Sequence, residues 1–462
     1  MRYVSTRGGG EAVPFAEAML TGLAEDGGLF VPEAMPRLPE ETVGGAYSEL
    51  AAAVLALFAP ELAAAEVQRV AEAAYSSGRF DHPDVVSITQ LDDDLWLGGL
   101  SHGPTLAFKD MALQLLGELF ELELERRDTR LTVLGATSGD TGSSAEYAMI
   151  GKDRVEVYML SPHGRMTPFQ AAQMYSLDEP NIHNLAVRGV FDDCQDLVKA
   201  VNGDAEFKAT HNIGAVNSIN WARIVAQVVY YVYLSHRVGE GRPVDFAVPT
   251  GNFGNVYAGF VAKEIGAPIR RLIVATNENN VLAEFFETGM YRVRPAEDVF
   301  ATSSPSMDIA KASNFERYVY DLSDGDTTAI SRWFGHLRAG APVDLSSLRH
   351  AVAASGFEAG TSTHRDRLST IRAVYENKDI VIDPHTADGV TVGQQLAEDG
   401  VPLVCLETAR AVKFSDTIRE ALGWVPGSAE AVADLLDRPH HITLIAADVA
   451  AVKAEIAHHS AA

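Results

Sequence analysis

Between residues 81 and about 275, segments with the pattern of buried strands alternate with segments of helical periodicity. The strand-like runs are rich in valine, isoleucine and leucine, and they cover 131–135, 155–160, 182–187, 244–248 and 269–275. The helical segments cover 144–150, 167–174, 191–201, 221–234 and 256–265. Two parallel strands need a long crossover, usually a helix, so this alternation is typical of an α/β fold with parallel sheets.

The rest of the chain lies on either side of this region. Residues 1–80 combine a short strand at 3–5 with helical segments at 13–23, 47–58 and 61–74, which predicts a helical N-terminal extension. After residue 280 the periodicity weakens through 300–313 and then returns as helices, with strands expected at 380–382 and 401–406. At 462 residues the chain exceeds a usual single core, so we expect two or more folding units, with boundaries near 80, 105 and 215.

The charge of the chain excludes two classes of partner. Lysine and arginine total 37 against 63 for aspartate and glutamate, a formal net charge of −26. Such a field repels nucleic acid and anionic membranes, so neither is an expected partner. The N-terminus lacks the apolar core of a signal peptide, and no apolar run reaches the about 20 residues that span a bilayer. With only two cysteines, Cys194 and Cys405, a soluble cytoplasmic protein is expected.

A lysine at the start of a predicted helix is the first candidate for chemistry. Lys109 closes the segment 101–110, which follows a strand-like run at 94–100 and leads into an apolar helix. A helix start carries partial positive charge and favours anions. Together with the apolar residues 106–108, it should lower the pKa of the ammonium group and free the amine for reaction with a carbonyl. The alternative is an ordinary surface lysine with Asp110 as a local cap.

Two turns that connect a strand to a helix have the composition of anion sites. The first contains Thr137, Ser138, Asp140 and Thr141 with two glycines, and it can converge N–H and hydroxyl donors on a carboxylate. A purely structural helix cap is an equally good interpretation of that turn. The second, Thr250 to Asn255, reads Thr-Gly-Asn-Phe-Gly-Asn and suits a phosphate at a helix N-terminus. It matches neither a P-loop nor a nicotinamide dinucleotide fingerprint.

A third anion site is predicted at the head of the long helix 221–234. Asn217 and Ser218 precede the helix, and Arg223 lies in its first turn, where its guanidinium can add a forked contact to an anion. The alternative is a structural cap with Arg223 in a surface ion pair. The histidines are scattered without metal-ligand spacing, so no metal is expected. One reactive lysine with three anion sites suits pyridoxal phosphate and a substrate with two anionic groups.

Motifs from nearly the whole chain resemble those of the threonine synthases, which are pyridoxal phosphate enzymes of fold type II in the tryptophan synthase β family. The motifs are 22–32 (GLAEDGGLFVP), 103–110 (GPTLAFKD), 135–142 (GATSGDTG), 217–223, 251–255 (GNFGN), 306–309 with 313–317 (SMDI and SNFER), 383–387 (DPHTA), 407–409 (ETA) and 413–414 (KF). The sequence departs from the family pattern where Arg410-Ala411 replaces the usual His-Pro.

The resemblance implies two open twisted α/β domains with the cofactor between them. The small domain would be 106–215, the large domain 81–105 with 216–462, and 1–80 the N-terminal extension. Lys109 would bind the cofactor covalently, and Thr408 would place its hydroxyl near the pyridine nitrogen. The phosphate of the cofactor would lie on Gly251, Asn252, Phe253, Gly254 and Asn255.

The resemblance also implies a reaction, in which O-phospho-L-homoserine and water give L-threonine and phosphate. Thr137, Ser138, Asp140 and Thr141 would hold the region of the substrate carboxylate, and Asn217, Ser218 and Arg223 would hold the leaving phosphate. We interpret 306–317 and 383–387 as structural. Enzymes of similar length are often monomers, which weakly favours a monomer. The alternatives are a serine or threonine dehydratase on the same fold and a catalytically silent binding module.

Overall fold

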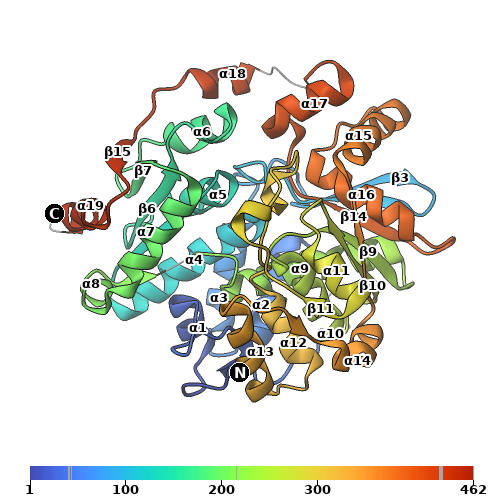
Figure 1. The fold of residues 1–462 in the computed structure, drawn as a ribbon, viewed down its shortest axis with the longest axis horizontal. Helices are drawn as coiled ribbons and strands as arrows, with labels where there is room; N and C mark the ends of the chain where they lie inside the picture. The colour runs from blue at the N-terminus through green and yellow to red at the C-terminus, as the bar shows by residue number, and fades with distance from the viewer. Residues whose placement is uncertain (40–41, 43, 215, 426–429, 461–462) are drawn as a thin grey trace.

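A computed structural model of the chain describes residues 1–462 except 40–41, 43, 215, 426–429 and 461–462. Two sheets form its framework, the smaller at the left of Figure 1 and the larger at the right. The larger sheet has six strands in the order β13-β10-β9-β14-β4-β3, and all its neighbours are parallel except β3 and β4. Its strands are β3 (Ser87–Asp92), β4 (Leu95–Gly99), β9 (Val244–Pro249), β10 (Ile269–Thr276), β13 (Phe357–Thr361) and β14 (Leu403–Glu407).

The smaller sheet is entirely parallel and has the order β15-β7-β6-β5-β8. Its strands are β5 (Leu131–Ala136), β6 (Val155–Pro162), β7 (Ile182–Arg188), β8 (Ile213–Gly214) and β15 (Thr443–Ala446). Two short antiparallel pairs lie outside both sheets, namely β1 (Tyr3–Ser5) with β2 (Phe30–Pro32) and β11 (Met290–Tyr291) with β12 (Val343–Asp344). The two parallel sheets confirm the predicted α/β fold of type II.

Helices cover the sheets and fill the space between them (Figure 1). Around the smaller sheet lie α4 (Lys109–Arg127), α5 (Asp140–Met149), α6 (Pro168–Tyr175), α7 (Phe191–Gly203), α8 (Ala205–Thr210), α18 (Glu430–Asp437) and α19 (Val449–Ser460). The helices of the larger sheet and its surroundings are α9 (Trp221–Gly239), α10 (Gly254–Ile265), α11 (Val281–Thr288), α12 (Phe315–Leu322), α13 (Thr327–Arg338), α14 (Arg349–Ser355), α15 (His364–Lys378), α16 (Pro384–Leu396) and α17 (Ser415–Leu422).

The long helix α9 lies at the centre of the main core. Seventeen of its nineteen residues are buried, because it packs against α4, α10 and the N-terminal helices α1 (Phe15–Thr21) and α2 (Tyr47–Phe58). The other N-terminal helix, α3 (Ala64–Ala74), packs on α2 and α4. The helices of the N-terminal extension therefore help to fix α4 and α9, the two helices whose first turns were predicted to contribute to the site.

Besides β3, which was not predicted, two features of the larger sheet and its surroundings differ from the sequence prediction. The predicted strand at 380–382 is wrong, because only Ile382 forms a bridge, to Arg410, and α16 begins at Pro384. A proline cannot donate to a strand ladder, which ends the extended run after a few residues. Conversely, β13 was not predicted, since the sequence Phe-Glu-Ala-Gly-Thr of this half-buried edge strand lacks a clear apolar pattern.

The domain boundaries remain a prediction, and the predicted boundary residue 215 lies outside the described residues. One pairing bears on the division. Strand β15 belongs to the C-terminal segment but lies beside β7 in the smaller sheet, so a division by sheets assigns this end of the chain to the small domain. Within the described ranges, no helix has both the length and the apolarity needed to cross a membrane.

Candidate active site

Backbone contacts fix the start of α4 against the strand end that carries Thr408. Leu106 adopts a left-handed conformation with φ of 58°, which turns the chain back before the helix. The N–H of Phe108 donates to the carbonyl of Thr408 at 2.8 Å, and the N–H of Arg410 donates to the carbonyl of Leu106 at 3.1 Å. Lys109, the first residue of α4, is thereby held close to Thr408. The exchange of His-Pro for Arg410-Ala411 leaves this backbone pairing in place.

All fourteen residues predicted for the cofactor and the substrate line one cavity of about 920 Å³. The cavity lies where the first turns of α4, α5, α9 and α10 meet the loop after β14. Parallel strands end at the same edge of a sheet, which brings loops that are distant in sequence to one place. Phe191 and Phe300 also line the cavity, and Phe300 is 59% exposed. The structure therefore brings together every predicted site residue.

Lys109 lies in a poor environment for a positive charge. Its side chain is 14% exposed, and its Nζ lies 3.7 Å from Oδ2 of Asp140. Burial lowers the pKa of the Lys109 amine, and the charges of Lys413 and Arg223 lower it further, while Asp140 opposes them. The direction predicted from the sequence is confirmed, although burial and neighbouring cations are the causes rather than local sequence alone. The amine is thus suited to reaction with a carbonyl and to proton transfer.

The turn before α10 has the geometry of a phosphate cradle. Phe253 has φ of 65°, and the helix begins at Gly254 with no side-chain cap. The first N–H groups of such a helix lack intrahelical partners and point at whatever lies in front of them. The Nδ2 of Asn255 is buried without a partner, whereas its Oδ1 accepts from the hydroxyls of Tyr230 and Tyr231 at 2.6 and 2.9 Å, which fixes the amide. Free donors therefore face this end of the cavity.

Arg223 is a buried cation in the wall of the same cavity. It is 3% exposed, its Nη1 donates to the carbonyl of Val216 at 2.9 Å, and its Nε has no partner. No ion pair of Arg223 is present among the described residues, and burial lowers the pKa of its guanidinium to about 10. Ser218 and Asn217 lie beside it on the cavity surface. An anionic ligand would relieve the cost of this unpaired buried charge.

The turn before α5 combines hydroxyl donors with a carboxylate. The Oγ1 of Thr137 accepts from the N–H groups of Gly139 and Gly142 at 3.0 and 2.9 Å, which fixes the turn. Ser138 is exposed to the cavity, and Thr141 is half-buried. Burial alone would raise the pKa of Asp140, but the cations of Lys413 and Lys109 hold it well below its ordinary value. Asp140 is therefore ionised and faces the lysines.

Thr408 presents an unpaired hydroxyl to the cavity. Its N–H donates to Oγ1 of Thr386 at 3.1 Å, whereas its own Oγ1 is buried without a partner. Thr386 in turn donates to Asp383, the capping residue of α16. Within the segment 383–387, which was predicted to be structural, Asp383 and Thr386 support Thr408, whereas His385 lines the cavity.

Comparison with known proteins identifies the family. Family models match along the chain, namely "Threonine synthase N terminus" over 2–75, "Pyridoxal-phosphate dependent enzyme" over 84–402 and "Threonine synthase, C-terminal" over 386–456. The threonine synthase of Corynebacterium glutamicum is 51% identical, covering 98% of this chain and 97% of the relative. The threonine synthase of Methylobacillus glycogenes is 48% identical, covering 99% of this chain and 100% of the relative. The chain belongs to the threonine synthase family.

A solved structure agrees with this membership. The threonine synthase of Brucella melitensis, described as bound to pyridoxal phosphate, superposes with a TM-score of 0.95 at 41% identity over 100% of both chains. The predicted threonine synthase activity and pyridoxal phosphate cofactor are confirmed. Threonine synthase homologues act on small molecules, and the site described above is a cavity of matching scale. The dehydratase and the silent binding module are no longer competing interpretations.

The threonine synthase cavity includes residues that the sequence analysis did not assign to it. Ser306 to Lys311 and Ser313 line it, as does His385, whose Nε2 accepts from the N–H of Ser306 at 3.0 Å. Ser306 also donates from Oγ to Oδ2 of Asp140 at 3.2 Å. The structural role predicted for 306–317 fits Asn314 and Arg317, whereas the residues 306–311 and 313 line the cavity. The one available signal was the interruption of helical periodicity at 300–313, which is typical of binding loops.

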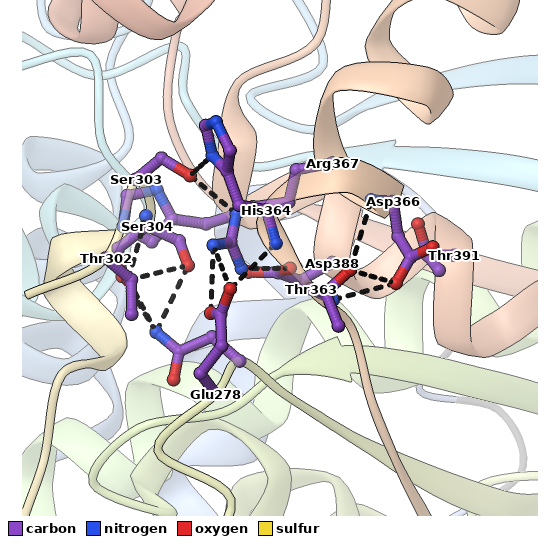
Figure 2. A network of polar contacts seen from close by, with 12 residues as sticks. Glu278, Thr302, Ser303, Ser304, Thr363, His364, Asp366, Arg367, Asp388 and Thr391 are labelled. Atoms are coloured by element: carbon purple, nitrogen blue, oxygen red, sulfur yellow. Dashed lines mark hydrogen bonds and ion pairs between the residues drawn. The ribbon is translucent and has the colours of Figure 1, made fainter. Parts of the chain in front are cut away.

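An ion network around the buried Arg367 holds the segment 302–308, which leads into these cavity-lining residues (Figure 2). Arg367 on α15 is fully buried and donates to Asp388 at 3.0 Å, to both oxygens of Glu278 at 2.9 Å and to Ser303 at 2.7 Å. Asp308 accepts from Asn277 and Asn279 at 2.8 and 2.9 Å and from Thr302. Segment 302–308 is thus attached to the larger sheet. Among the residues that the structure describes, no cluster of three metal-ligating side chains forms.

Proposed function

We propose that the chain converts O-phospho-L-homoserine and water to L-threonine and phosphate in this cavity, with Lys109 as its catalytic residue. The proposal is carried by one observation, that buried donors without partners surround a lysine in a poor environment for charge. These donors are Nε of Arg223, Nδ2 of Asn255 and the hydroxyl of Thr408. Buried polar groups are normally paired, so their presence in one cavity favours a ligand with several acceptors.

The residues fit pyridoxal phosphate. Gly251 to Asn255 would hold its phosphate at the start of α10, and Thr408 would contact the ring nitrogen with a neutral hydroxyl. A Cβ at Gly251 would lie 3.1 Å from the carbonyl oxygen of Ser306, so a larger residue would narrow the cavity at this point. When bound, the cofactor supplies a conjugated system that takes up the electron pair left at the substrate Cα.

Two groups of residues would orient the substrate at its opposite ends. Thr137, Ser138 and Thr141 offer hydroxyl and N–H donors to the carboxylate. Asn217, Ser218 and Arg223 would hold the γ-phosphate, where the guanidinium can form charge-assisted hydrogen bonds. Binding at both ends fixes the reacting carbons relative to Lys109, so that binding energy is used for orientation. Asp140, being ionised, would not contact the carboxylate directly, and we place it with Lys109 instead.

Lys109 would move protons at the substrate. Its neutral amine would take the proton from Cα, and loss of a Cβ proton would allow the Cγ–O bond to break, with the electron pair leaving on phosphate. Water would then add its hydroxyl at Cβ, Cγ would receive a proton to become the methyl group of threonine, and the Lys109 ammonium would return a proton to Cα. The sum of these steps consumes one water and releases one phosphate.

Two measurements test the proposal. Borohydride reduction of the cofactor-loaded protein followed by peptide mapping should place the pyridoxyl label on Lys109. Incubation with O-phospho-L-homoserine should release phosphate and threonine in equal amounts, while incubation with threonine should give no 2-oxobutyrate. A label on another lysine, or 2-oxobutyrate from threonine at a comparable rate, would overturn it. Lys152→Met, which alters a buried lysine outside the cavity, serves as the control.

We also propose the domain division, the location and the oligomeric state. The small domain would comprise 106–215 and the large domain 81–105 with 216–462. The pairing of β15 with β7 supports one change to this division, in which the C-terminal segment that contains β15 belongs to the small domain. Both cysteines are free and buried, which is consistent with a cytoplasmic protein. The proposed monomer is tested by sedimentation of the loaded protein.

A further inference from the structure

A second lysine lies buried directly behind the wall that carries Lys109. Lys413 is 1% exposed, and its Nζ has three acceptors, the carbonyl of Thr105 at 2.7 Å, Oδ1 of Asp140 at 2.9 Å and Oε1 of Gln173 at 3.1 Å. An ammonium group has three N–H donors, and here each of them has a partner. Lys413 is therefore placed to stay charged in the core.

Asp140 lies between the two lysines but is bound to only one of them. Its Oδ1 accepts from Lys413 and from Nε2 of Gln170 at 3.1 Å. Its Oδ2 accepts from Ser306 at 3.2 Å and lies 3.7 Å from Nζ of Lys109. The contact of Asp140 with Lys413 is a hydrogen-bonded ion pair. The 3.7 Å between Asp140 and Lys109 is too long for a hydrogen bond. The carboxylate is thus already neutralised before it reaches Lys109.

We propose that Lys413 is a positioning residue that competes with Lys109 for the carboxylate of Asp140 and so keeps the Lys109 amine free to take a proton. This inference rests on the proposed role of Lys109 as the base. The pair of Lys413 and Asp140 has no net charge, so a proton on Lys109 gives these three side chains a net positive charge, and Asp140 offsets it only in part. Without Lys413, Asp140 would pair with Lys109 and hold the proton on it.

The other charged groups around Lys109 do not replace this pair. Arg223 on α9 is a cation and acts in the same direction as Lys413. Asp110 on α4 accepts from the N–H and the hydroxyl of Thr105 at 2.7 Å, and burial raises its pKa to about 6. His385 on α16 bonds Asp383, and Asp308 is held by Asn277 and Asn279. Asp110 also raises the pKa of Lys109, but less than Asp140 does, so Asp140 is the main anion that Lys413 has to neutralise.

The position of Lys413 also links the two sheets. It lies in the 3-10 turn η5 (Ala411–Phe414), which follows β14 and Thr408, whereas Asp140 and Gln173 lie on α5 and α6 beside the smaller sheet. Its contact with Thr105 reaches the loop that ends at Lys109. One side chain thus connects the segment that carries Thr408 with the segment that carries the reactive amine.

The test measures the protonation of Lys109 without relying on turnover. The full-length protein, freed of cofactor, is labelled with trace acetic anhydride across a pH series, and the peptide containing Lys109 is quantified by mass spectrometry. Lys413→Met should raise the pKa of Lys109 by about one, which makes the reactive neutral amine about tenfold scarcer near neutral pH. Asp140→Asn should lower this pKa, and the double variant should return towards wild type, because it again has no net charge.

Several outcomes would overturn the inference. Lys413→Met without effect, or shifts in the same direction for Lys413→Met and Asp140→Asn, would indicate a merely structural role. Lys152→Met removes another buried ion-paired lysine, and an equal shift there would have the same meaning. If Lys413→Met fails to fold, the double variant is compared with Asp140→Asn, and equal pKa values refute the proposal. Because labelling reports on the amine itself, failure here differs from a borohydride label found on another lysine.

Discussion

Arg223 shows how a single residue can be costly for the fold and useful for the ligand. Its guanidinium is buried in the cavity wall, and within the described chain its one recorded hydrogen bond goes to the carbonyl of Val216. Taking a charge out of water without a counter-ion lowers the stability of the fold. Natural proteins keep such an unpaired buried charge mainly where a ligand supplies its partner. Thr408 is the uncharged counterpart, since its hydroxyl is also buried without a partner in the wall of this cavity.

Substituting Arg223 and Thr408 one at a time should separate effects on substrate binding from effects on cofactor binding. Arg223→Ala should lower kcat/KM for O-phospho-L-homoserine by about 10- to 100-fold, because hydrogen bonds to charged groups contribute about 1.5–3 kcal/mol. Its cofactor absorbance should stay near that of wild type. Thr408→Val should instead change the cofactor spectrum and weaken cofactor binding. The measurements are steady-state kinetics and titration with pyridoxal phosphate.

The control for this pair is Arg237→Ala, which alters an arginine at the far end of α9 outside the cavity. It should leave both quantities unchanged. Loss of cofactor absorbance in Arg223→Ala with intact substrate affinity would refute the assignment of Arg223 to the phosphate.

At the scale of elements, the segment 313–317 holds two ligand loops together. Asn314 donates from its N–H to the carbonyl of Asn252 at 3.0 Å and from Nδ2 to the carbonyl of Ser218 at 3.1 Å. Arg317 is fully buried and donates to Oδ1 of Asn314 at 2.5 Å and to the carbonyl of Ile219 at 2.7 Å. The start of α12 therefore sets the distance between the loop 251–255, which we propose to hold the cofactor phosphate, and the head of α9.

Asn314→Ala should loosen both loops. The variant keeps the backbone N–H bond to Asn252 but loses the bonds from Nδ2 to the carbonyls of Ser218 and Asn252 at 3.1 and 3.2 Å. The Ser218 carbonyl left without this donor costs about 1–3 kcal/mol, and the loop at Asn252 is held by one bond instead of two, so both the free energy of unfolding and the cofactor affinity should fall. The matched control is Asn181→Ala, since Asn181 bridges the carbonyls of Met149 and Val155 away from the cavity. That variant should lose stability alone. A cofactor affinity unchanged in Asn314→Ala would contradict the role given to this residue.

Sequence patterns predicted elements well where one physical signal dominated. The helix 47–58 was predicted with its observed bounds, because its apolar residues repeat at helical spacing. The three residues 380–382 were too few to distinguish a strand from an extended turn before Asp383-Pro384. The cavity-lining residues 306–311 were missed because a loop has no periodicity, and its contacts with Asp140 and His385 depend on the tertiary fold.

At the scale of the whole molecule, a buried carboxyl makes stability depend on pH. Glu146 on α5 is completely buried, and this burial raises its pKa well above the ordinary value. It is therefore neutral when folded, whereas the unfolded chain ionises near pH 4.3. The stability that it contributes is fully present below that pH and is lost as pH rises through the raised folded pKa.

Glu146→Gln should remove the loss of stability that Glu146 causes at high pH. The variant and the wild type should unfold at similar denaturant concentrations at pH 4, and the variant should be more stable at pH 8, with a gap that grows by up to about 1.4 kcal/mol per pH unit. Glu125→Gln, an exposed change on α4, should show no such gap. Chemical denaturation of the loaded protein at pH 4, 6 and 8 measures the difference. A gap independent of pH would mean that Glu146 is ionised in the fold.

The pairing of β15 with β7 has a consequence for synthesis on the ribosome. Strand β7 is translated well before its neighbour β15, which follows on the order of tens of seconds later at cellular elongation rates. During that interval the hydrogen-bonding edge of β7 stands open, and open edges are where nascent chains associate wrongly. Pairing with β15 closes that edge, so a segment that is translated late protects a sheet whose other strands are translated much earlier.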